Sequence, residues 1–512
     1  MKGRVDPEPE AGDSMPHGKR KFLSFVLTLG TCLLAFQAGG ATASSAQGLY
    51  QKIDSVMSAV ARRDHFAGAV LVVDKGVLVY QKAFGPAVLA TGKALTVSSM
   101  FELASLTKQF TAMGIMILRE RGKLDYKDEL EKYFPALPYK GVTIRHLLNH
   151  TSGLPDFKAL FDEKWDKSKI ADNDDVLELF AEYRPPAEFA PGEAWAYSNT
   201  GYVMLASIIE KVSGETYREF LQRHIFDKLD MRRTRVVTRR FLPEKFDDFA
   251  YGYVFSFAAG GYVLPDEEVS TKRVVYLDGV VGSGRIHSTI EDLYKWDRAL
   301  AVGALVSPKR LKEAFTEGRL NDGSGIGYGF GWLVGTNKKR RMFSHTGSYP
   351  GYAHISVRFP DIDRSIVILT LNDAYPRLWE ILDEALDGNR AIVPPMRADL
   401  AIKRGLMGKK PPAVAEMIEA ILREKSRYEF DRVSLDRLGN DALDAGKIDE
   451  AVEIFKLIVD VLPPSADAHE SLADAYRLRG DGPRAIEHYK EALKIDSERE
   501  RVKAMLRELE KK

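Results

Sequence analysis

The sequence predicts an α+β fold, in which one antiparallel sheet is combined with helices, followed by an all-α region of helical repeats. Two apolar stretches, 67–73 and 77–83, flank the turn Asp74-Lys75-Gly76, a composition typical of a hairpin. From about Arg397 onward the chain has helical patterning. Further segments with strand patterning lie at 328–335, 341–346, 352–359 and 365–371. We expect the early hairpin and these late strands to join in one sheet.

Length and charge limit the classes of function. At 512 residues with 45% hydrophobic residues, the chain is long enough for two domains. Lys and Arg number 74 against 73 Asp and Glu, which gives a formal net charge of +1. This balance provides no global field that would attract nucleic acid or an anionic membrane. We therefore expect no nucleic-acid partner, and membrane association only through the N-terminal segment.

Residues 1–46 have the composition of a secretion signal with an atypical acidic extension. A basic cluster at 17–21 precedes a short apolar run at 22–36, and small residues at 41–43 or 44–46 provide a cleavage site. Met15 is a candidate start beside Met1. The prediction is an exported protein, periplasmic or secreted, or anchored in the membrane if the signal is not cleaved.

Cysteine and metal chemistry are not expected. Cys32 is the only cysteine and lies inside the apolar run, so the mature protein would have no thiol for a disulfide, a metal or a nucleophile. His146 and His150 have the i, i+4 spacing of a zinc-binding helix, but a metalloprotease would need glutamate where the chain has Leu147. We interpret both histidines as structural and predict neither metal nor cofactor.

A serine and a lysine three residues apart are the first candidates for catalysis. Ser105 and Lys108 begin a helix-compatible run, so both side chains should leave the same face of one helix. A serine hydroxyl becomes a good nucleophile when a neighbouring base takes its proton, and lysine is a base only when burial or a nearby cation disfavours its ammonium form. Because S-x-x-K also arises by chance, the pair needs support from other motifs.

Two later motifs provide that support. Tyr197-Ser198-Asn199 precedes a helix predicted at 202–212, and His345-Thr346-Gly347 lies on a late strand that the sheet would return to the serine. The glycine-rich segment 279–285 lacks the Lys-Ser/Thr ending of a phosphate loop, so we interpret it as a tight turn before a capped helix. No G-x-S-x-G element of an alpha/beta-hydrolase occurs.

These pieces, in this order, resemble the serine beta-lactamase and penicillin-binding-protein superfamily, in its class C beta-lactamase-like and esterase-like branch. The similarity covers roughly Tyr50 to Gly388 and rests on Ser105-Leu106-Thr107-Lys108, Tyr197-Ser198-Asn199 and His345-Thr346-Gly347 taken together. It implies a hydrolase domain at 47–390, with helices on both faces of the antiparallel sheet and an additional all-helical lobe.

The resemblance also implies a role for each site residue. Ser105 would attack a carbonyl and become acylated, with Lys108 taking or relaying its proton. Tyr197 would pass the proton to the leaving group and later activate water, and Asn199 would hydrogen-bond Lys108 and the substrate. The N–H groups of Ser105 and Ser348 would form the oxyanion hole. Along the late strand, the substrate would lie against His345, Thr346, Gly347 and Ser348.

Two departures from the family pattern bear on the substrate. Many relatives carry lysine where this chain has His345, which is mostly neutral at pH 7 and so would bind a substrate carboxylate less tightly. Arg285 stands where relatives commonly have a second glycine. It would either restore a cation for an anionic substrate or face solvent.

The C-terminal part repeats at a period of 34 residues. A pair of tetratricopeptide-like repeats with a capping helix is expected at 431–512. Because two repeats are few for independent stability, we expect a helical linker at 391–430 to add a further helical pair. The repeats would bind a protein or peptide, or serve as a buttress or self-contact. Equivalent positions are Leu438 and Leu472, Gly446 and Gly480, Ala451 and Ala485, Phe455 and Tyr489.

The hypothesis is an exported serine hydrolase that acts through an acyl-enzyme on a small ester, amide or peptide. Esterase or D-amino-acid-peptidase activity is favoured over beta-lactamase activity because of His345. The alternative is a catalytically silent, penicillin-binding-like sensor or scaffold that works through its helical repeats. The intact Ser105, Lys108 and Tyr197 argue against that alternative.

Overall fold

A computed structural model describes residues 40–64, 66–238, 248–372, 377–390, 392–408 and 412–511. The predicted signal up to residue 39, with Cys32 and both candidate starts, lies outside these residues. The first helix, α1, runs from Gly40 to Asp64.

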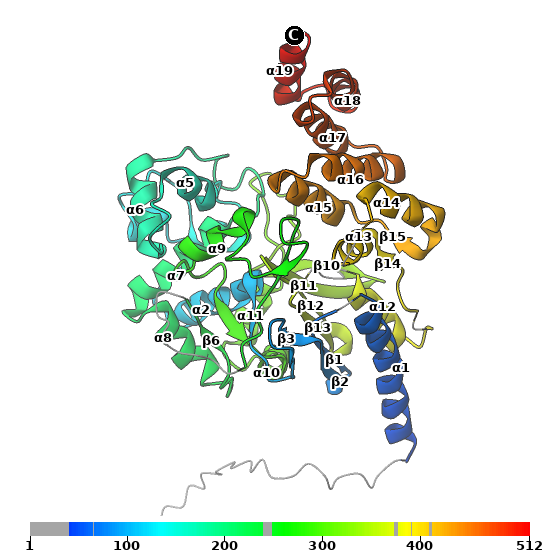
Figure 1. Cartoon of the computed structure of the whole chain (residues 1–512). Helices are drawn as coiled ribbons and strands as arrows, with labels where there is room; N and C mark the ends of the chain where they lie inside the picture. Colours follow the sequence, from blue (N-terminus) through cyan, green and yellow to red (C-terminus); the bar gives the residue numbers. More distant parts are fainter. Residues whose placement is uncertain are drawn as a thin grey trace, which may run out of the picture. The chain divides into compact units, whose positions relative to one another are not determined.

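The central sheet has six antiparallel strands in the order β10-β11-β12-β13-β1-β2, which confirms that the hairpin and the late strands join (Figure 1). Lys75 and Gly76 at the tip of the hairpin both have positive φ, 52° and 77°, as in the two-residue turn that matches strand twist. Tyr328 was predicted to begin a strand, but the strand starts at Leu333. The strands are β1 Gly68–Asp74, β2 Val77–Phe84, β10 Leu333–Asn337, β11 Arg340–Tyr349, β12 Tyr352–Phe359 and β13 Arg364–Thr370.

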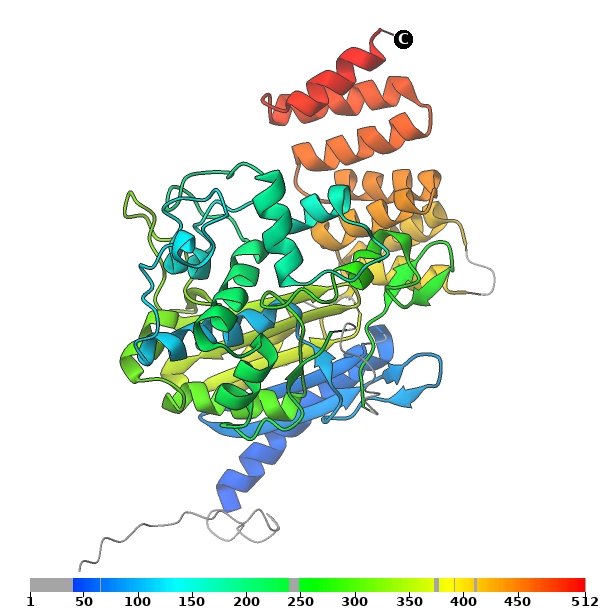
Figure 2. The ribbon, with the colours of Figure 1, turned by 90° about the vertical axis from the view of Figure 1, so that its left-hand side faces the viewer.

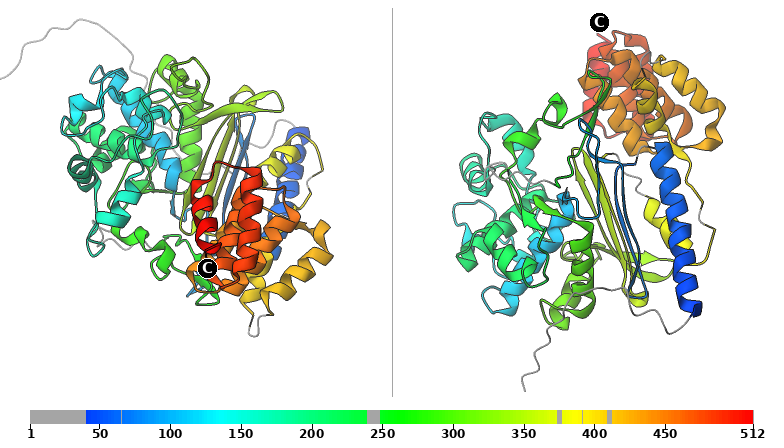
Figure 3. Two further views of the ribbon diagram at one scale, coloured as in Figure 1. Left: turned by 90° about the horizontal axis from the view of Figure 1, so that it is seen from above. Right: turned by 60° about the horizontal axis from the view of Figure 1, so that its bottom comes forward.

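Both faces of the sheet are covered by helices because successive side chains of its buried strands point to opposite sides. On one face, Val70 and Val72 of β1 pack with apolar residues of α1 and of α12, Leu378–Leu386. On the other face, Ala69 and Leu71 belong to the large core that includes α2, Thr107–Glu120, and α10, Ile290–Val302. Figure 3 shows this layering in its right-hand view.

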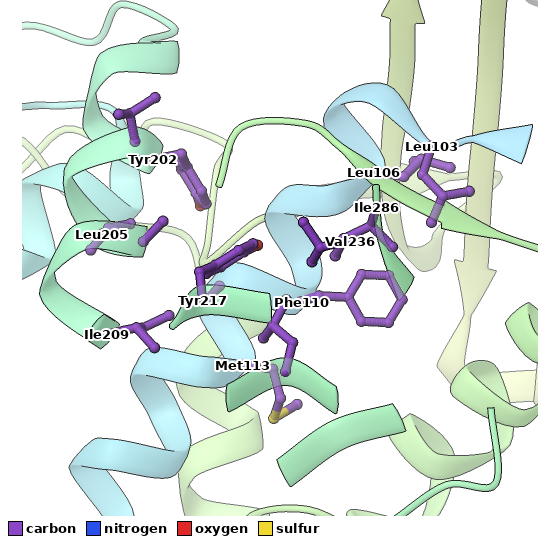
Figure 4. Close-up of a cluster of buried hydrophobic side chains, with 14 of the residues drawn as sticks. Leu103, Leu106, Phe110, Met113, Tyr202, Leu205, Ile209, Tyr217, Val236 and Ile286 are labelled. Atoms are coloured by element: carbon purple, nitrogen blue, oxygen red, sulfur yellow. The ribbon is translucent and has the colours of Figure 1, made fainter. Parts of the chain in front are cut away.

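Helix α2 lies in the interior of the domain, since residues 107 to 118 are all buried. It packs closely on α7, Asn199–Ser213, because Gly114 leaves room for Ile209: an added Cβ would lie 2.8 Å from the Ile209 side chain. Figure 4 shows Phe110 and Met113 among the apolar residues of this cluster. The remaining helices of the domain are α3 Leu130–Tyr133, α4 Ile144–Asn149, α5 Phe157–Lys164, α6 Asn173–Tyr183, α8 Tyr217–Leu221, α9 Arg273–Tyr276 and α11 Pro308–Ala314.

A second sheet, of three short strands, includes the residues just before the serine. β5, Phe101–Glu102, pairs with β9, Ile286–Ser288, which also pairs with β6, Arg235–Val236. Thr289 then caps α10 by accepting a hydrogen bond from the Asp292 N–H, as the sequence predicted for this turn. Two further hairpins are β3 Pro86–Val88 with β4 Lys93–Ala94, and β7 Val254–Ser256 with β8 Gly261–Val263.

The C-terminal region is helical and stacks two helical pairs and a final helix (Figure 2). The apolar residues of the 34-residue period are buried in one core, which confirms the repeat: Leu438 and Leu472, Ala451 and Ala485, Phe455 and Tyr489. Gly446 and Gly480 are exposed and have positive φ, 71° and 83°. That core also contains Phe255 and Phe257 from β7 and the residue after it. The elements are β14 Met396–Arg397, α13 Ala398–Leu406, α14 Val414–Arg423, β15 Tyr428–Glu429, α15 Arg432–Asp444, α16 Ile448–Val461, α17 Ala466–Leu478, α18 Gly482–Ile495 and α19 Glu500–Leu509.

Within the described part of the chain, which begins at Gly40, no helix combines the length and apolarity needed to cross a membrane.

Candidate active site

A cavity of about 460 Å³ brings the three sequence motifs together. Ser105 lies on one wall, Tyr197 and Asn199 on another, and the outer part of β11 on a third. The loop at 283–285 and the α9 region close the remaining side. The spatial arrangement that the sequence required is therefore present.

Ser105 does not belong to the same α-helix as Lys108. It sits in a 3₁₀ turn, η1, Ala104–Leu106, and α2 begins at Thr107. The preceding residue, Ala104, has a positive φ of 49°, which is strained for a residue with a Cβ. Glu102 supports this turn, since its Oε1 accepts hydrogen bonds from the N–H of Ala104 at 3.2 Å and of Arg285 at 2.8 Å. Although the turn separates Ser105 from α2, the Ser105 hydroxyl and the Lys108 amine still lie next to each other, 3.1 Å apart.

Lys108 is fully buried and its amine has three neighbours. Nζ lies 2.9 Å from Asn199 Oδ1, 3.1 Å from the Ser283 carbonyl oxygen and 3.1 Å from Ser105 Oγ. The first two neighbours can only accept hydrogen bonds. A neutral amine has two N–H groups for them and one lone pair, which is then left facing the Ser105 hydroxyl.

The environment favours that neutral form. Burial, and then the positive charge of Lys158, lower the pKa of Lys108 well below its usual value, while Asp156 acts in the opposite direction. The ring of Tyr197 lies 4.8 Å from Nζ, and because an aromatic face attracts a cation, it also acts in that opposite direction. Burial is the largest effect on the pKa, so Lys108 meets the electrostatic condition for a general base.

This electrostatic coupling predicts a pH effect of Lys158→Ala. Protonated Lys108 cannot accept a proton, so activity should rise as pH increases through the pKa of Lys108. Removing the Lys158 charge raises that pKa, and the acid limb of kcat/KM for an uncharged ester should move to higher pH. Lys169→Ala removes an exposed lysine outside the cavity lining and is the matched control. An unmoved acid limb in Lys158→Ala would contradict the coupling.

Tyr197 is held by the neighbouring His150. His150 ends α4 in the left-handed conformation, with φ 62°, and its Nδ1 accepts a hydrogen bond from the Ser198 N–H at 3.1 Å. The two rings of His150 and Tyr197 lie 4.4 Å apart. Burial raises the pKa of Tyr197, and a hydrogen bond with Ser105 acts in the opposite direction, although 40% of the residue is exposed through the cavity. Tyr197 therefore stays a neutral phenol at neutral pH.

Asn199 starts α7, and Ser198 caps that helix by accepting a hydrogen bond from the Gly201 N–H at 3.2 Å. The cap fixes the Asn199 side chain toward Lys108, as the resemblance implied.

On β11, burial alternates along the strand. Thr346 and Ser348 are exposed and line the cavity, whereas His345 and Gly347 are buried. β10 pairs with β11 only from Arg340 to Ser344, so the outer part of β11 is left to approach η1 instead. An added Cβ on Gly347 would lie 2.5 Å from the Leu103 carbonyl oxygen, so Gly347 permits this approach.

We predict that Gly347→Ala pushes β11 away from η1. The expected cost is about 1–3 kcal/mol of the free energy of unfolding, together with a loss of activity. Gly335→Ala on β10, where an added Cβ meets nothing within 4 Å, is the control in the same sheet. Urea unfolding and ester hydrolysis of both variants test this, and equal behaviour of the two would show that the close approach is unimportant.

His345 is neutral and its tautomer is fixed. Burial, and then the charge of Lys108, lower the pKa of His345 to about 3. Its Nδ1 lies 2.6 Å from the Thr346 carbonyl oxygen, an acceptor, so Nδ1 carries the hydrogen. Nε2 then accepts a hydrogen bond from the Tyr328 hydroxyl at 2.8 Å. The strand consequently offers the substrate no positive charge at this position.

Arg285 does not face solvent, so that alternative is wrong. It is 5% exposed, with φ 79°, and its guanidinium lies 3.7 Å from Glu102 and 3.5 Å from Asp278. It also donates a hydrogen bond to the Tyr349 hydroxyl. Its charge is balanced by two buried carboxylates, although it touches the cavity wall.

Several site residues could not be identified from the sequence. Ser283 acts through its backbone carbonyl, which leaves no pattern of side chains. Glu102 acts through Arg285, 183 residues later in the chain, and Tyr328 acts through His345, 17 residues later. His150 was interpreted as structural, and its hydrogen bond from the Ser198 N–H and its ring contact with Tyr197 place it beside the catalytic motif. Among the described residues, no group of three or more His, Cys, Asp or Glu side chains that could hold a metal ion is found.

A six-stranded antiparallel sheet, with a serine on the wall of the cavity and a buried lysine beside it, defines the class of penicillin-binding and beta-lactamase-type serine hydrolases. The beta-lactamase family model matches residues 53–386, more than half of the sequence, and the chain belongs to this family. A tetratricopeptide repeat model matches residues 437–500.

Similar proteins agree with this assignment. Penicillin-binding protein 4* of Bacillus subtilis is 43% identical over 319 residues, which are 62% of this chain and 71% of that protein. The putative penicillin-binding protein PbpX of the same organism is 29% identical over 63% of this chain and 73% of its own length.

Among solved structures, D-amino acid amidase from Ochrobactrum anthropi SV3 is 25% identical, with a TM-score of 0.53 over 66% of this chain and 96% of the amidase. The octameric penicillin-binding protein homologue from Pyrococcus abyssi is also 25% identical, with a TM-score of 0.56 over 67% of this chain and 78% of that one.

Proposed function

We propose that the protein is an exported hydrolase that cleaves a small ester, amide or peptide through an acyl-enzyme on Ser105. The observation that carries this proposal is the 3.1 Å approach of a buried amine, Lys108 Nζ, to Ser105 Oγ, with both N–H groups of the neutral amine directed to other acceptors. A binding protein would have no need to keep an uncharged lysine beside a hydroxyl.

The proposed steps combine this geometry with the roles that the family resemblance implies. Lys108 takes the proton of Ser105 while Oγ adds to the substrate carbonyl carbon, and the oxyanion is stabilised by the N–H groups of Ser105 and Ser348. The proton then passes, with the help of the Tyr197 phenol, to the leaving alcohol or amine as its bond to the carbonyl carbon breaks. Water adds to the acyl-enzyme by the reverse route and releases the acid.

Two observations favour D-amino-acid derivatives or simple esters as substrates. The chain resembles D-amino acid amidase over almost all of that enzyme. In addition, the neutral His345 weakens the argument for a beta-lactam, whose carboxylate would meet a lysine in many relatives. Beta-lactam hydrolysis would then be a weak side activity.

Export and a protein partner complete the proposal. The basic and apolar segments at 17–36 support export. The tetratricopeptide repeats have the capacity to bind a protein or peptide.

The test uses the purified protein with a fluorescent phosphonate, a panel of D- and L-aminoacyl 4-nitrophenyl esters and amides, and nitrocefin. We expect labelling of Ser105 and turnover of at least one ester or amide. A wild-type protein that neither reacts nor turns over, like Ser105→Ala, would remove the enzyme and leave the silent sensor as the function.

A further inference from the structure

The cavity wall carries more positive than negative charge. Of its charged lining residues, three are cations, Lys158, Arg273 and Arg285, and one is the carboxylate Glu102. Arg285 faces two carboxylates, Glu102 and Asp278, so this buried group contributes no net positive charge to the wall. The unbalanced charge in the wall therefore comes from Lys158 and Arg273.

These two cations come from different elements on the same cavity. Lys158 is the second residue of α5, and Arg273 is the first residue of α9. Phe157, Leu277 and Val280 line the same cavity and give its wall an apolar surface. An apolar wall with cationic side chains fits a substrate that has a carbon body and an anionic end.

Both cations are loosely paired. Lys158 Nζ lies 3.6 Å from Asp156 Oδ2, and Arg273 Nη2 lies 3.8 Å from Asp162 Oδ2, both longer than a hydrogen bond. The side chains of the two cations are 36% and 44% exposed. Exposed pairs of this kind contribute little, so an incoming carboxylate can compete with Asp156 and Asp162.

Lys158 also lies within electrostatic reach of the reaction centre, because its charge acts on the pKa of Lys108. An anion held at Lys158 is therefore part of the same site, not a distant surface feature. The late strand offers no alternative cation, because His345 is neutral.

We infer that Lys158 and Arg273 form an anion-binding subsite of the active-site cavity, and that the substrate of the proposed hydrolase carries a carboxylate away from its scissile carbonyl. This inference rests on the proposed function. The anionic group would then be bound by side chains of α5 and α9 rather than by a side chain of the late strand β11.

The experiment compares matched ester pairs that differ by one carboxylate. 4-Nitrophenyl butyrate and mono-4-nitrophenyl succinate place the charge on the acyl side, whereas phenyl acetate and 3-acetoxybenzoate place it on the leaving group. The ratio of kcat/KM for the anionic over the neutral ester is measured at low ionic strength. The proteins are wild type, Lys158→Ala/Arg273→Ala, and Lys169→Ala/Lys309→Ala, which removes two cations outside the cavity lining.

We expect the wild type to prefer the anionic ester in one of the two pairs, and this identifies the side that carries the carboxylate. In Lys158→Ala/Arg273→Ala that ratio should fall about tenfold or more, whereas the control double variant should keep it. The ratio, rather than either rate, is decisive because any effect of Lys158 on Lys108 applies to both esters. Equal ratios in wild type and Lys158→Ala/Arg273→Ala for both pairs would overturn the inference.

A binding measurement separates failure of the inference from failure of the proposed function. Calorimetry with Ser105→Ala protein compares 3-acetoxybenzoate with phenyl acetate, and mono-4-nitrophenyl succinate with 4-nitrophenyl butyrate. Tighter binding of an anionic ester that is lost in Ser105→Ala/Lys158→Ala/Arg273→Ala supports the subsite even if the wild type turns over none of the esters. Absence of any such difference overturns the subsite whether or not esters are hydrolysed.

Discussion

Ser105→Ala is expected to lower kcat/KM for the best ester substrate by on the order of 10⁴ to 10⁶-fold. The Ser105 hydroxyl oxygen is the atom that bonds to the acyl group, and it lies on the cavity wall within hydrogen-bond distance, 3.1 Å, of the buried amine. The loss should appear in kcat, with thermal unfolding unchanged, because Ser105 is a small residue at the cavity surface. Turnover and phosphonate labelling, read by mass spectrometry of the labelled peptide, measure it.

Ser283→Ala is the matched control for Ser105→Ala. Ser283 lines the same cavity but contributes its backbone carbonyl to Lys108, which alanine retains. It should keep most of the activity. Substantial labelling or turnover in Ser105→Ala would contradict the assignment of the nucleophile.

Lys108→Met is expected to lower kcat by about 10² to 10⁴-fold, the usual contribution of a general base. Methionine fills the buried space of the lysine stem but provides no basic nitrogen. Lys108→Arg should be as inactive as Lys108→Met, because a guanidinium keeps the positive charge and cannot accept a proton at any accessible pH.

The comparison of the two Lys108 variants separates two roles. If the lysine acted only as a charge, Lys108→Arg would retain activity that Lys108→Met loses. Since Ser105 and Lys108 act as one unit, Ser105→Ala/Lys108→Met should be no slower than Ser105→Ala alone. A further loss in the double variant would mean that Lys108 stabilises a step independent of Ser105.

Patterns that repeat locally allowed much of the fold to be predicted. The turn at Lys75 and Gly76 predicted the hairpin, and the strand patterning at 352–359 and 365–371 predicted β12 and β13. The 34-residue period predicted apolar positions of the repeats that are buried in the structure. These features depend on neighbours within one hairpin or one helical pair, so the residues that specify them lie close together in the sequence.

Features that depend on distant partners could not be predicted. The burial of Arg285 depends on Glu102, 183 residues away, and on Tyr349, 64 residues away. The left-handed Ala104 that turns Ser105 out of α2 has no glycine to mark it. The neutral state of His345 could be predicted from the ordinary pKa of histidine. The hydrogen bond from Tyr328 that fixes its tautomer could be identified only in the structure.

The site residues show the same division. The motifs identified Ser105, Lys108, Tyr197 and Asn199, and the fold brings them to one cavity. The acceptors that leave the Lys108 lone pair facing Ser105 are an amide from α7 and a backbone carbonyl at Ser283, and only the first has a signature in the sequence. The charge state of Lys108 therefore rests on the structure.

Titration of Lys108 by NMR tests that charge state most directly. Protein labelled with [ε-¹³C]lysine is followed from acid to alkaline pH, and Lys108→Arg identifies the resonance by its disappearance. We predict that Lys108 keeps the chemical shift of a neutral amine at pH values where the exposed lysines, with pKa near about 10.4, are still protonated. A Lys108 resonance that titrates together with those of the exposed lysines would contradict the account.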